Sequence, residues 1–527
     1  MTDLHRSARV MTVLTVVSRL SGFARMIVFA SVFGGTLLDN VYNSANTVPN
    51  ILFELFAAGA LQAVLVPTMV RLMPRGDNAP EAEDLAGTLV GVLSVALAGV
   101  GLLAAAFGPW IMGLLLNDMD PVVREDAIEL GALFLWFFAP QLMFYGVNVV
   151  ATAVLNAKNR FALPVFAPTL NNVVVILAYL AYGWMHAGDP TLEVTSAEAW
   201  LIAGGTTAAV IAFCALPVVG VARTGFSLRP RFSLRSAALR RLAREGAWAG
   251  VFLGFTQIVL VVVIVVANRV NGGTTAYNLA FVLFTLPHAL FAVPVMTTRF
   301  PEMSRTAADG DWAGYANSVS TAVRSIAFLT LFSTAAIIAL AQPGARLVSY
   351  GQGEKLAPII GEATLAFAPG LLGWSLLLFF TRAFYARGDA RTPALVNGGV
   401  AAFCVVAMLA VVPGLGDEHL ISGLTGTYAM ANLGGAAVLG RLAARSAVGA
   451  GAPLIAIGRS FAHDVPAALV AAGVGLVVTR TIGWDGRPSS MLAALVGAPV
   501  VLGTFLFVRM LFGGSHPRVA VSTLGAE

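Results

Sequence analysis

The sequence has very little charge for its length. Only 11% of its 527 residues are Asp, Glu, Lys or Arg, whereas soluble domains carry roughly 25%. So few charged side chains cannot cover the surface of a water-soluble chain, and the 58% of hydrophobic residues excludes an intrinsically disordered one. A membrane-spanning helix needs about 20 apolar residues. The composition therefore predicts an all-α polytopic membrane protein.

Cysteine, lysine and histidine are also scarce. The two cysteines, Cys214 and Cys404, each lie in an apolar run, so we expect no disulfide. Neither of the two lysines, Lys158 and Lys355, follows a glycine-rich loop that could hold phosphates, which excludes a Walker-type ATPase. The six histidines have no metal-ligand spacing. We therefore expect no cofactor, no metal, no nucleic-acid partner and no enzyme activity.

What the sequence does contain is a succession of long apolar runs. Fourteen of these runs, separated by charged residues, Pro or Gly, are candidate transmembrane segments. They lie near residues 10–34, 40–70, 86–116, 124–156, 161–185, 199–222, 246–268, 275–298, 314–341, 358–386, 392–413, 420–444, 461–480 and 489–512.

The basic residues are distributed unevenly around these segments. If the N-terminus is cytoplasmic, twenty-three of the 32 basic residues fall at or near cytoplasmic ends and connections, six fall on the opposite side, and three (Arg19, Arg25 and Arg324) lie inside segments. Cytoplasmic loops of membrane proteins carry such an excess of Lys and Arg. The asymmetry predicts that both termini are cytoplasmic.

A basic connection and a repeat divide the chain. Residues 223–245 hold six closely spaced arginines, with Leu234, Ala238 and Leu242 at helical spacing, which predicts an amphipathic helix on the inner leaflet or a simple linker. Phe138-Ala139-Pro140 recurs as Phe367-Ala368-Pro369, and residues 67–71 resemble 301–305. We therefore predict two parallel six-helix lobes around a central cavity. The predicted parts are residues 1–222 and 246–445 (lobes), 223–245 (linker), 446–513 (two further helices) and 514–527 (cytoplasmic tail).

Two arginines interrupt the first apolar run. Arg19 and Arg25 each lie about 4–5 Å along the axis from the middle of segment 10–34. Arginine at that depth costs at least about 2.5–3.5 kcal/mol and normally faces a wet cavity or a partner. They could snorkel, pair with Asp39 or Glu54, or bind an anion such as phosphate. Six residues apart, they point about 120° apart on a regular helix, so one ligand would require a bend at Ser21-Gly22.

Other polar residues lie in or beside the segments. Segment 40–70 contains an interruption at Pro49-Asn50 and Glu54 at its centre, where Glu54 could pair with an arginine or take up a proton or cation. Asp39 could cap a helix at the outer end. Arg269 and Arg299 lie near segment ends and fit the charge bias of loops. The Asn171-Asn172 pair could join helices by hydrogen bonds.

The string Ser18-Arg19-Leu20-Ser21-Gly22-Phe23-Ala24-Arg25 resembles the opening signature of the MurJ/MviN family of lipid II flippases. Asp39, Pro49-Asn50-Ile51-Leu52, Gly59-Ala60 and Val66-Pro67 follow in that family's order, and the string Tyr42 to Asn50 looks like its high-GC Gram-positive branch. The motifs are concentrated in residues 15–71. The resemblance departs in three places: Phe53 and Glu54 replace an arginine pair, Ala58 replaces an acid, and the eighth segment has Val282 in place of an arginine.

The resemblance implies a fourteen-helix carrier of the multidrug/oligosaccharidyl-lipid/polysaccharide exporter superfamily, in which the last two helices form a groove for a polyprenyl tail. It implies lipid II as cargo, a bacterial cell membrane location, a monomer, and contacts with membrane lipids and possible cell-wall synthesis or division proteins. The candidate substrate-binding residues are Arg19, Arg25, Asp39, Asn50 and Glu54, with Arg269 and Arg299 as secondary candidates. Alternatives are a flippase for another polyprenyl-linked glycan and a cation-coupled multidrug antiporter.

Overall fold

The structure is a computed structural model. It describes residues 2–55, 59–73, 79–186, 188–232, 237–410, 412–446 and 451–512, and within them there are helices and connections but no β-strand. The chain divides into two compact units, one made of Met1–Thr275 with Tyr350–Gly353 and the other of Ala276–Ser349 with Glu354–Glu527. The all-α prediction is confirmed.

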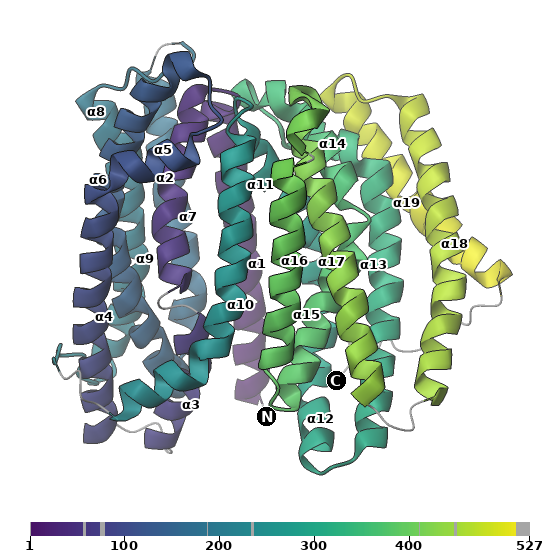
Figure 1. The fold of residues 1–527 in the computed structure, drawn as a ribbon, viewed down its shortest axis with the longest axis horizontal. Helices are drawn as coiled ribbons and strands as arrows, with labels where there is room; N and C mark the ends of the chain where they lie inside the picture. Colours follow the sequence, from purple (N-terminus) through teal and green to yellow (C-terminus); the bar gives the residue numbers. More distant parts are fainter. Residues whose placement is uncertain are drawn as a thin grey trace. The chain divides into compact units, whose positions relative to one another are not determined.

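The helices of the first unit follow one another along the chain, and several run side by side (Figure 1). They are α1 (Thr2–Phe33), α2 (Leu37–Phe53), α3 (Gly59–Leu72), α4 (Pro80–Ala106), α5 (Gly108–Leu115), α6 (Pro121–Ala157), α7 (Ala162–Met185), α8 (Ser196–Ala199), the π-helical turn η2 (Trp200–Gly204), α9 (Gly205–Ala222) and α10 (Ala237–Ala267).

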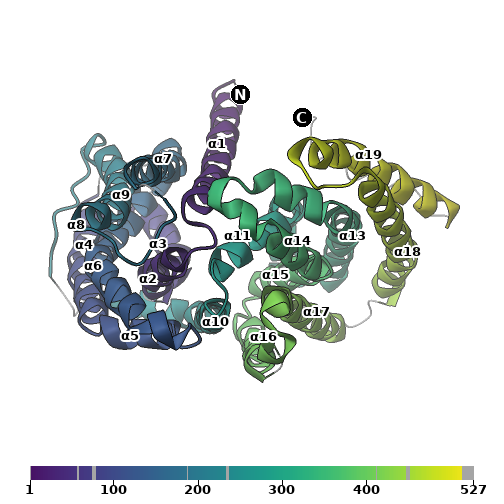
Figure 2. The same ribbon diagram turned by 90° about the horizontal axis from the view of Figure 1, so that it is seen from above.

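The second unit begins within the next helix. Its elements are α11 (Gly273–Pro287), the π-helical turn η3 (His288–Ala292), α12 (Val293–Ala308), α13 (Trp312–Val348), α14 (Ala357–Phe367), α15 (Gly370–Ala386), α16 (Arg391–Ala410), η5 (Val412–Leu415), η6 (Asp417–His419), α17 (Leu420–Ser446), α18 (Gly451–Ile482) and α19 (Arg487–Leu511). The short helix η4 (Gly351–Leu356) begins in the first unit and ends in the second. Viewed from above, α18 and α19 lie beside α13 (Figure 2).

Helices occupy all fourteen segments expected from the apolar runs. Among the described residues, eleven helices are long and apolar enough to cross a membrane, or twelve if the bent pair 351–367 and 370–386 is one span. The other two segments are α2 with α3, which are each too short to cross alone, and α17. Fewer than the expected fourteen helices therefore reach this length and apolarity, because α14 and α15 form a bent pair, residues 56–58 between α2 and α3 lie outside the described residues, and α17 is not apolar enough.

Local sequence explains where several helices begin. The hydroxyl of Thr36 accepts a hydrogen bond from the N–H of Asp39 at the start of α2, and Asp120 does the same for Val122 at the start of α6. Pro121 occupies the first position of α6, where a missing N–H costs nothing. Thr195 and Glu198 form a reciprocal capping box ahead of α8.

The two copies of the Phe-Ala-Pro repeat have different local structures. Pro140 lies inside the continuous helix α6, whereas Pro369 lies at a break where α14 and α15 meet at 55°. At Gly370, a Cβ atom would come within 2.6 Å of the Cα of Ala429, so the break brings α15 against α17. The repeat therefore marks corresponding positions but not identical bends.

Each unit has its own apolar core. In the first unit an aromatic cluster, which includes Phe29, Phe33, Tyr42, Phe134 and Tyr179, joins α1, α2, α6 and α7. In the second unit, alanines of α13 and α18 pack together with Val501 and Phe505 of α19. Small side chains allow membrane helices to approach closely.

The connection after α9 is held against α4. The N–H of Arg231 donates to the carbonyl of Gly87 (2.9 Å), and the N–H of Ser227 donates to a carboxylate oxygen of Glu83 (3.0 Å). Arg231 also forms an ion pair with Asp84. Residues 233–236 of the expected linker lie outside the described residues, and residues 237–245 form the first part of α10.

Candidate functional site

The two arginines of α1 lie in the first unit with different exposure. Arg19 is exposed and Arg25 is half-buried, and within the described part of the chain neither makes a hydrogen bond or an ion pair. Only 11% of the residues in the apolar window of α1 are buried, compared with 50% in α6. The N–H donors of both guanidinium groups are therefore unused among the described residues.

The expected bend at Ser21-Gly22 is not a break, because α1 is one continuous helix from Thr2 to Phe33. Instead this point contacts α7. The side-chain amide of Asn172 donates to the hydroxyl of Ser21 (3.0 Å), which itself donates to the carbonyl of Ser18 (2.9 Å). Asn172 is buried, and its role as a link between helices is as the sequence predicted. The contact fixes α1 between its two arginines.

Arg25 lies near three tyrosines, of which Tyr42 and Tyr179 are buried and Tyr145 is half-buried. Its charge interacts electrostatically with the hydroxyls of Tyr42, Tyr145 and Tyr179. The hydroxyl of Tyr42 is within hydrogen-bond distance of those of Tyr179 (2.8 Å) and Thr206 (2.6 Å). These residues were not among the candidates, because they come from four helices whose proximity no local spacing reveals. Polar hydroxyls beside Arg25 provide it with an environment less apolar than lipid.

The second expected segment is not interrupted at its proline. α2 continues through Pro49 and ends at Phe53, the next two residues, Glu54 and Leu55, are π-helical, and residues 56–58 lie outside the described residues. Asn50 is exposed, and its oxygen accepts a hydrogen bond from Tyr145 (3.4 Å). Tyr145 also interacts electrostatically with Arg25. The interruption predicted at Pro49-Asn50 is absent, because both residues lie inside α2.

Glu54 is half-buried at the C-terminal end of α2. It has no ion-pair or hydrogen-bond partner in the described residues, so pairing with Arg19 or Arg25 does not occur there. An unpaired carboxylate in a membrane segment is a polar group available to a cavity or a cation.

Asp39 is fully buried in the first turn of α2. One oxygen, Oδ1, accepts hydrogen bonds from the hydroxyl of Thr275 and the amide of Asn43, both at 2.6 Å, while Oδ2 accepts none. Its neighbour Asn40 donates to the carbonyl of Val270 (2.9 Å) and accepts from the N–H of Gly272 (2.9 Å). In this conformation, Asp39 is part of an internal polar cluster without access to solvent.

The secondary candidates have different surroundings. Arg269 is exposed on the turn that follows α10. Arg299 on α12 forms an ion pair with Glu302 at 3.0 Å. Arg324, the third arginine expected inside a span, lies half-buried on α13, and its Nε has no hydrogen-bond partner among the described atoms. Because Arg299 already has a carboxylate partner, it is less available to an anion than the arginines of α1.

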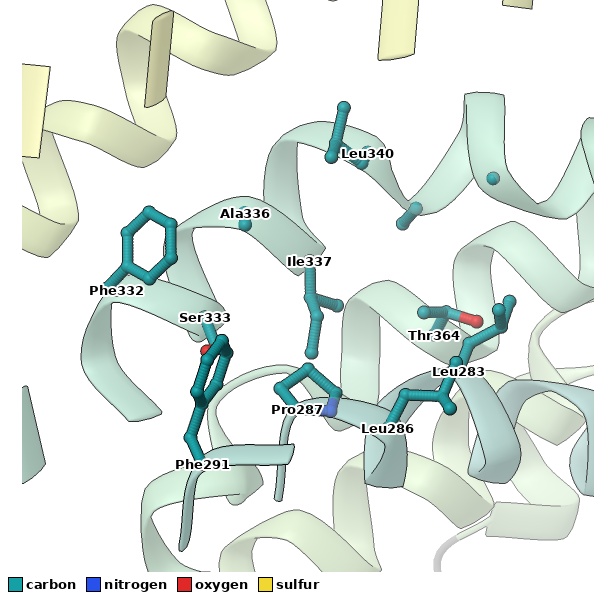
Figure 3. A pocket seen from close by; sticks show the side chains of 12 residues that line it. Leu283, Leu286, Pro287, Phe291, Phe332, Ser333, Ala336, Ile337, Leu340 and Thr364 are labelled. Atoms are coloured by element: carbon teal, nitrogen blue, oxygen red, sulfur yellow. The ribbon is translucent and has the colours of Figure 1, made fainter. Parts of the chain in front are cut away.

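An apolar cavity of about 290 Å³ lies within the second unit (Figure 3). Residues of α11, η3, α13 and α14 line it, among them Phe291, Phe332 and Ile337. Its hydroxyl-bearing residues, Ser333 and Thr364, bond to carbonyls of their own helices. Without a charged side chain, this cavity cannot be an anion site.

The last two helices are joined by a buried ion pair. The Nε of Arg509 on α19 donates to Oδ1 of Asp464 on α18 at 2.6 Å, and the guanidinium lies 4.7 Å from the ring centre of Phe328 on α13. The pair connects three helices of the second unit. Because Asp464 is 0% exposed, its charge depends on Arg509 for compensation.

Residues 29–497 match the family model for the lipid II flippase MurJ. The chain belongs to the MurJ family. A lipid II flippase MurJ from Burkholderia cenocepacia is 27% identical to it over 518 residues, covering 97% of each chain. The family match begins after the Ser18 to Arg25 string and extends well beyond residue 71, where the sequence motifs end.

Solved structures agree with the family assignment at the level of the fold. A structure described as lipid II flippase MurJ in an inward closed conformation matches with a TM-score of 0.74 and 18% identity, covering 95% of this chain and 99% of that one. An inward-facing multidrug resistance transporter of the MATE family matches with a TM-score of 0.64 and 14% identity, covering 84% and 98%. The MurJ family chain therefore shares its architecture with multidrug carriers.

Proposed function

We propose that this chain flips lipid II, the undecaprenyl-pyrophosphate-linked disaccharide pentapeptide, from the inner to the outer leaflet of a bacterial cell membrane. The single observation that carries the proposal is the pair Arg19 and Arg25 on a membrane helix with no anionic partner among the described residues. Membership of the MurJ family, whose model bears the name lipid II flippase, supports the choice of cargo.

The arginines act on the pyrophosphate. A guanidinium presents paired N–H donors that match phosphate oxygens, and its charge offsets the desolvation of the headgroup. Arg19 and Arg25 point in different directions, so they engage the headgroup from different sides of α1. Asn50 and Glu54 offer further polar contacts in the same unit, and Asp39 anchors the start of α2.

Transport proceeds by alternating access. The headgroup enters an inward-open cavity while the polyprenyl tail stays in lipid, and the two predicted lobes then expose it outward. An inside-negative potential favours outward movement of negative charge by about 2.3 kcal/mol per charge per 100 mV. Two charges give roughly 4–5 kcal/mol, which biases the cycle without ATP. A coupled ion gradient is the alternative source of energy.

The test is made in cells depleted of the protein. Wild type, Arg19→Ala or Arg25→Ala is expressed, and lipid II in the outer leaflet is measured with an externally added enzyme that cleaves its headgroup. We expect wild type to restore cleavage and both variants to insert but fail. Arg299→Ala is the matched control, because it removes an arginine that already has a partner. Normal exposure of lipid II with both variants would refute the anion site.

A second cargo is favoured by one observation. Val282 on α11 stands where the family resemblance places an arginine, so the second unit offers less positive charge there. A different polyprenyl-linked glycan would fit that difference. The two cargoes are distinguished by measuring flipping of lipid II, and of a teichoic-acid precursor on the same lipid carrier, by the purified protein in liposomes. Faster flipping of the second cargo would replace lipid II in the proposal.

The topology forms part of the same proposal. The charge bias supports cytoplasmic termini, with lobes at residues 1–222 and 246–445 joined by the basic linker 223–245. We propose a monomer that contacts membrane lipids. Cysteine-labelling at the two ends of the chain from the cytoplasmic side tests the orientation.

A further inference from the structure

Asp39 is a carboxyl group without a compensating cation. It is 0% exposed, and among the described residues no Lys, Arg or His forms an ion pair with it. Thr275 and Asn43 both donate to Oδ1 at 2.6 Å, and Oδ2 is buried without any hydrogen bond. The backbone of Gly35 also interacts with this carboxyl group. The ionised form would therefore leave a full negative charge buried with no cation beside it and with one oxygen lacking a hydrogen bond.

The charged and titratable groups on neighbouring elements do not supply that cation. Arg269 on the adjoining turn is exposed, Arg124 on α6 bonds to Gly113 and Asn117, and Tyr42 bonds to Tyr179 and Thr206. The remaining charged residues in the first turns of α6 are acidic, namely Glu125, Asp126 and Glu129. Arg25 on α1 interacts with tyrosine hydroxyls instead.

A buried charge without a partner is far more costly than a buried neutral carboxyl, and such a group takes up a proton instead. A protonated Asp39 still accepts both hydrogen bonds on Oδ1 and places its proton on the oxygen that has no donor. We propose that Asp39 is a proton-binding site, which carries a proton on Oδ2 in this conformation and releases it to water when its polar cluster opens.

The cluster that would open is specific. The amide of Asn40 donates to the carbonyls of Asn268 (3.2 Å) and Val270 (2.9 Å), and that of Asn268 donates to the hydroxyl of Ser44 (2.8 Å). These bonds clamp the first two turns of α2 onto the turn between α10 and α11. Separating the two elements admits water to Asp39, removes the hydrogen bond from Thr275 and allows ionisation.

Proton binding and closure of the clamp are therefore linked. Because the proton is bound in the closed arrangement and released in the open one, lower pH stabilises the clamp and higher pH favours its opening. The proposal holds for any cargo, since it concerns a group that faces no ligand in this conformation.

The test is infrared spectroscopy of the purified full-length protein in lipid nanodiscs at neutral pH, without substrate. We expect a C=O stretching band of a protonated carboxyl that Asp39→Asn removes. Asp389→Asn is the control. Partial burial raises the pKa of Asp389, but hydrogen bonds from the N–H and hydroxyl of Thr392 outweigh it and hold that pKa below its ordinary value, so this group contributes no such band.

A second variant keeps Asp39 in place. Thr275→Val preserves side-chain shape but removes one donor to Oδ1, so the band should move to higher frequency. An unchanged spectrum in both Asp39→Asn and Thr275→Val would overturn the proposal. Because no lipid II is present, that result would leave the proposed flippase activity untouched, and failure of flipping by Arg19→Ala would say nothing about the proton.

Discussion

Arg19 and Arg25 have the same side chain but different neighbours. Arg19 is exposed, whereas Arg25 is half-buried and interacts electrostatically with three tyrosine hydroxyls. An exposed side chain is more mobile, so holding it in place on a bound anion costs more side-chain entropy. We therefore expect Arg25 to set the position of the headgroup and Arg19 to add charge.

Asn172→Ala tests whether the contact between α1 and α7 positions these arginines. The substitution removes the hydrogen bond to Ser21. A typical hydrogen bond contributes about 0.5–1.5 kcal/mol, so we expect initial flipping to slow by about 2- to 12-fold. Asn171→Ala is the control, since its side chain has no hydrogen bond among the described residues. Measured in liposomes at equal protein content, equal rates for the two variants would contradict the positioning role.

The residues of the site were only partly predictable from sequence. Arg19 and Arg25 were identified because burying a charge in lipid is costly, so a charged residue inside an apolar run indicates a cavity, a partner or a ligand. Asp39 and Glu54 were also identified as charges in or beside apolar runs, yet the sequence could not show that neither forms an ion pair among the described residues. Partners such as Thr275, more than 200 positions away from Asp39, depend on tertiary packing that local periodicity does not encode.

At the scale of elements, proline predicts helix breaks poorly in this fold. Pro49 and Pro140 both lie inside helices, whereas Pro369 lies at the break between α14 and α15. A neighbouring helix that compensates for the missing hydrogen bond allows a proline to stay inside a membrane helix. Whether it does so depends on packing, so the sequence could indicate candidate positions but not choose between them.

Close packing of α15 on α17 yields a prediction about Gly373. A Cβ atom there would lie 2.5 Å from the backbone nitrogen of Leu433, so Gly373→Ala must displace a helix. Overpacking of this kind costs about 1–3 kcal/mol. Gly434→Ala on α17 is the control, because its Cβ would meet nothing within 4 Å. We expect a lower thermal unfolding temperature in detergent for the first only, and equal temperatures would argue against the close contact.

The ion pair between the last two helices makes a second prediction at this scale. Asp464→Asn leaves the buried charge of Arg509 without its partner, which destabilises a protein by about 3–5 kcal/mol. Replacing both residues, with Asp464→Asn and Arg509→Met, removes that charge and should restore part of the loss. Thermal unfolding of the two single variants and the double variant measures the coupling. Purely additive effects would show that the pair does not act as a unit.

For the whole molecule, hydropathy was sufficient to predict the class of fold. The apolar runs predicted a helix at every one of the fourteen segments, since each run is long enough to bury its backbone hydrogen bonds in lipid. The compact units divide after Thr275, beyond α10. The two six-helix lobes at residues 1–222 and 246–445, which the basic connection at 223–245 suggested, stay a prediction.

The membrane potential should drive flipping if two negative charges move outward. An inside-negative potential of 100 mV then favours the outer leaflet by roughly 4–5 kcal/mol. In liposomes with a potassium diffusion potential, we expect lipid II to accumulate in the favoured leaflet and the bias to reverse with the sign of the potential. Liposomes without a potassium gradient, and therefore without a membrane potential, are the control. Flipping that responds only to a pH gradient would point to proton coupling instead.

The segment that follows α9 has a consequence for distance. Its hydrogen bond from Arg231 to Gly87 pins the chain to α4, and α10 begins at Ala237. Six residues reach roughly 20 Å even when fully extended. The start of α10 must therefore stay within that distance of Gly87. Any functional motion either keeps it within that distance or first detaches the segment from α4. A bulky residue at Gly87 would clash with the carbonyl of Arg229. It would detach the segment from α4 and remove this limit on distance without altering any candidate binding residue.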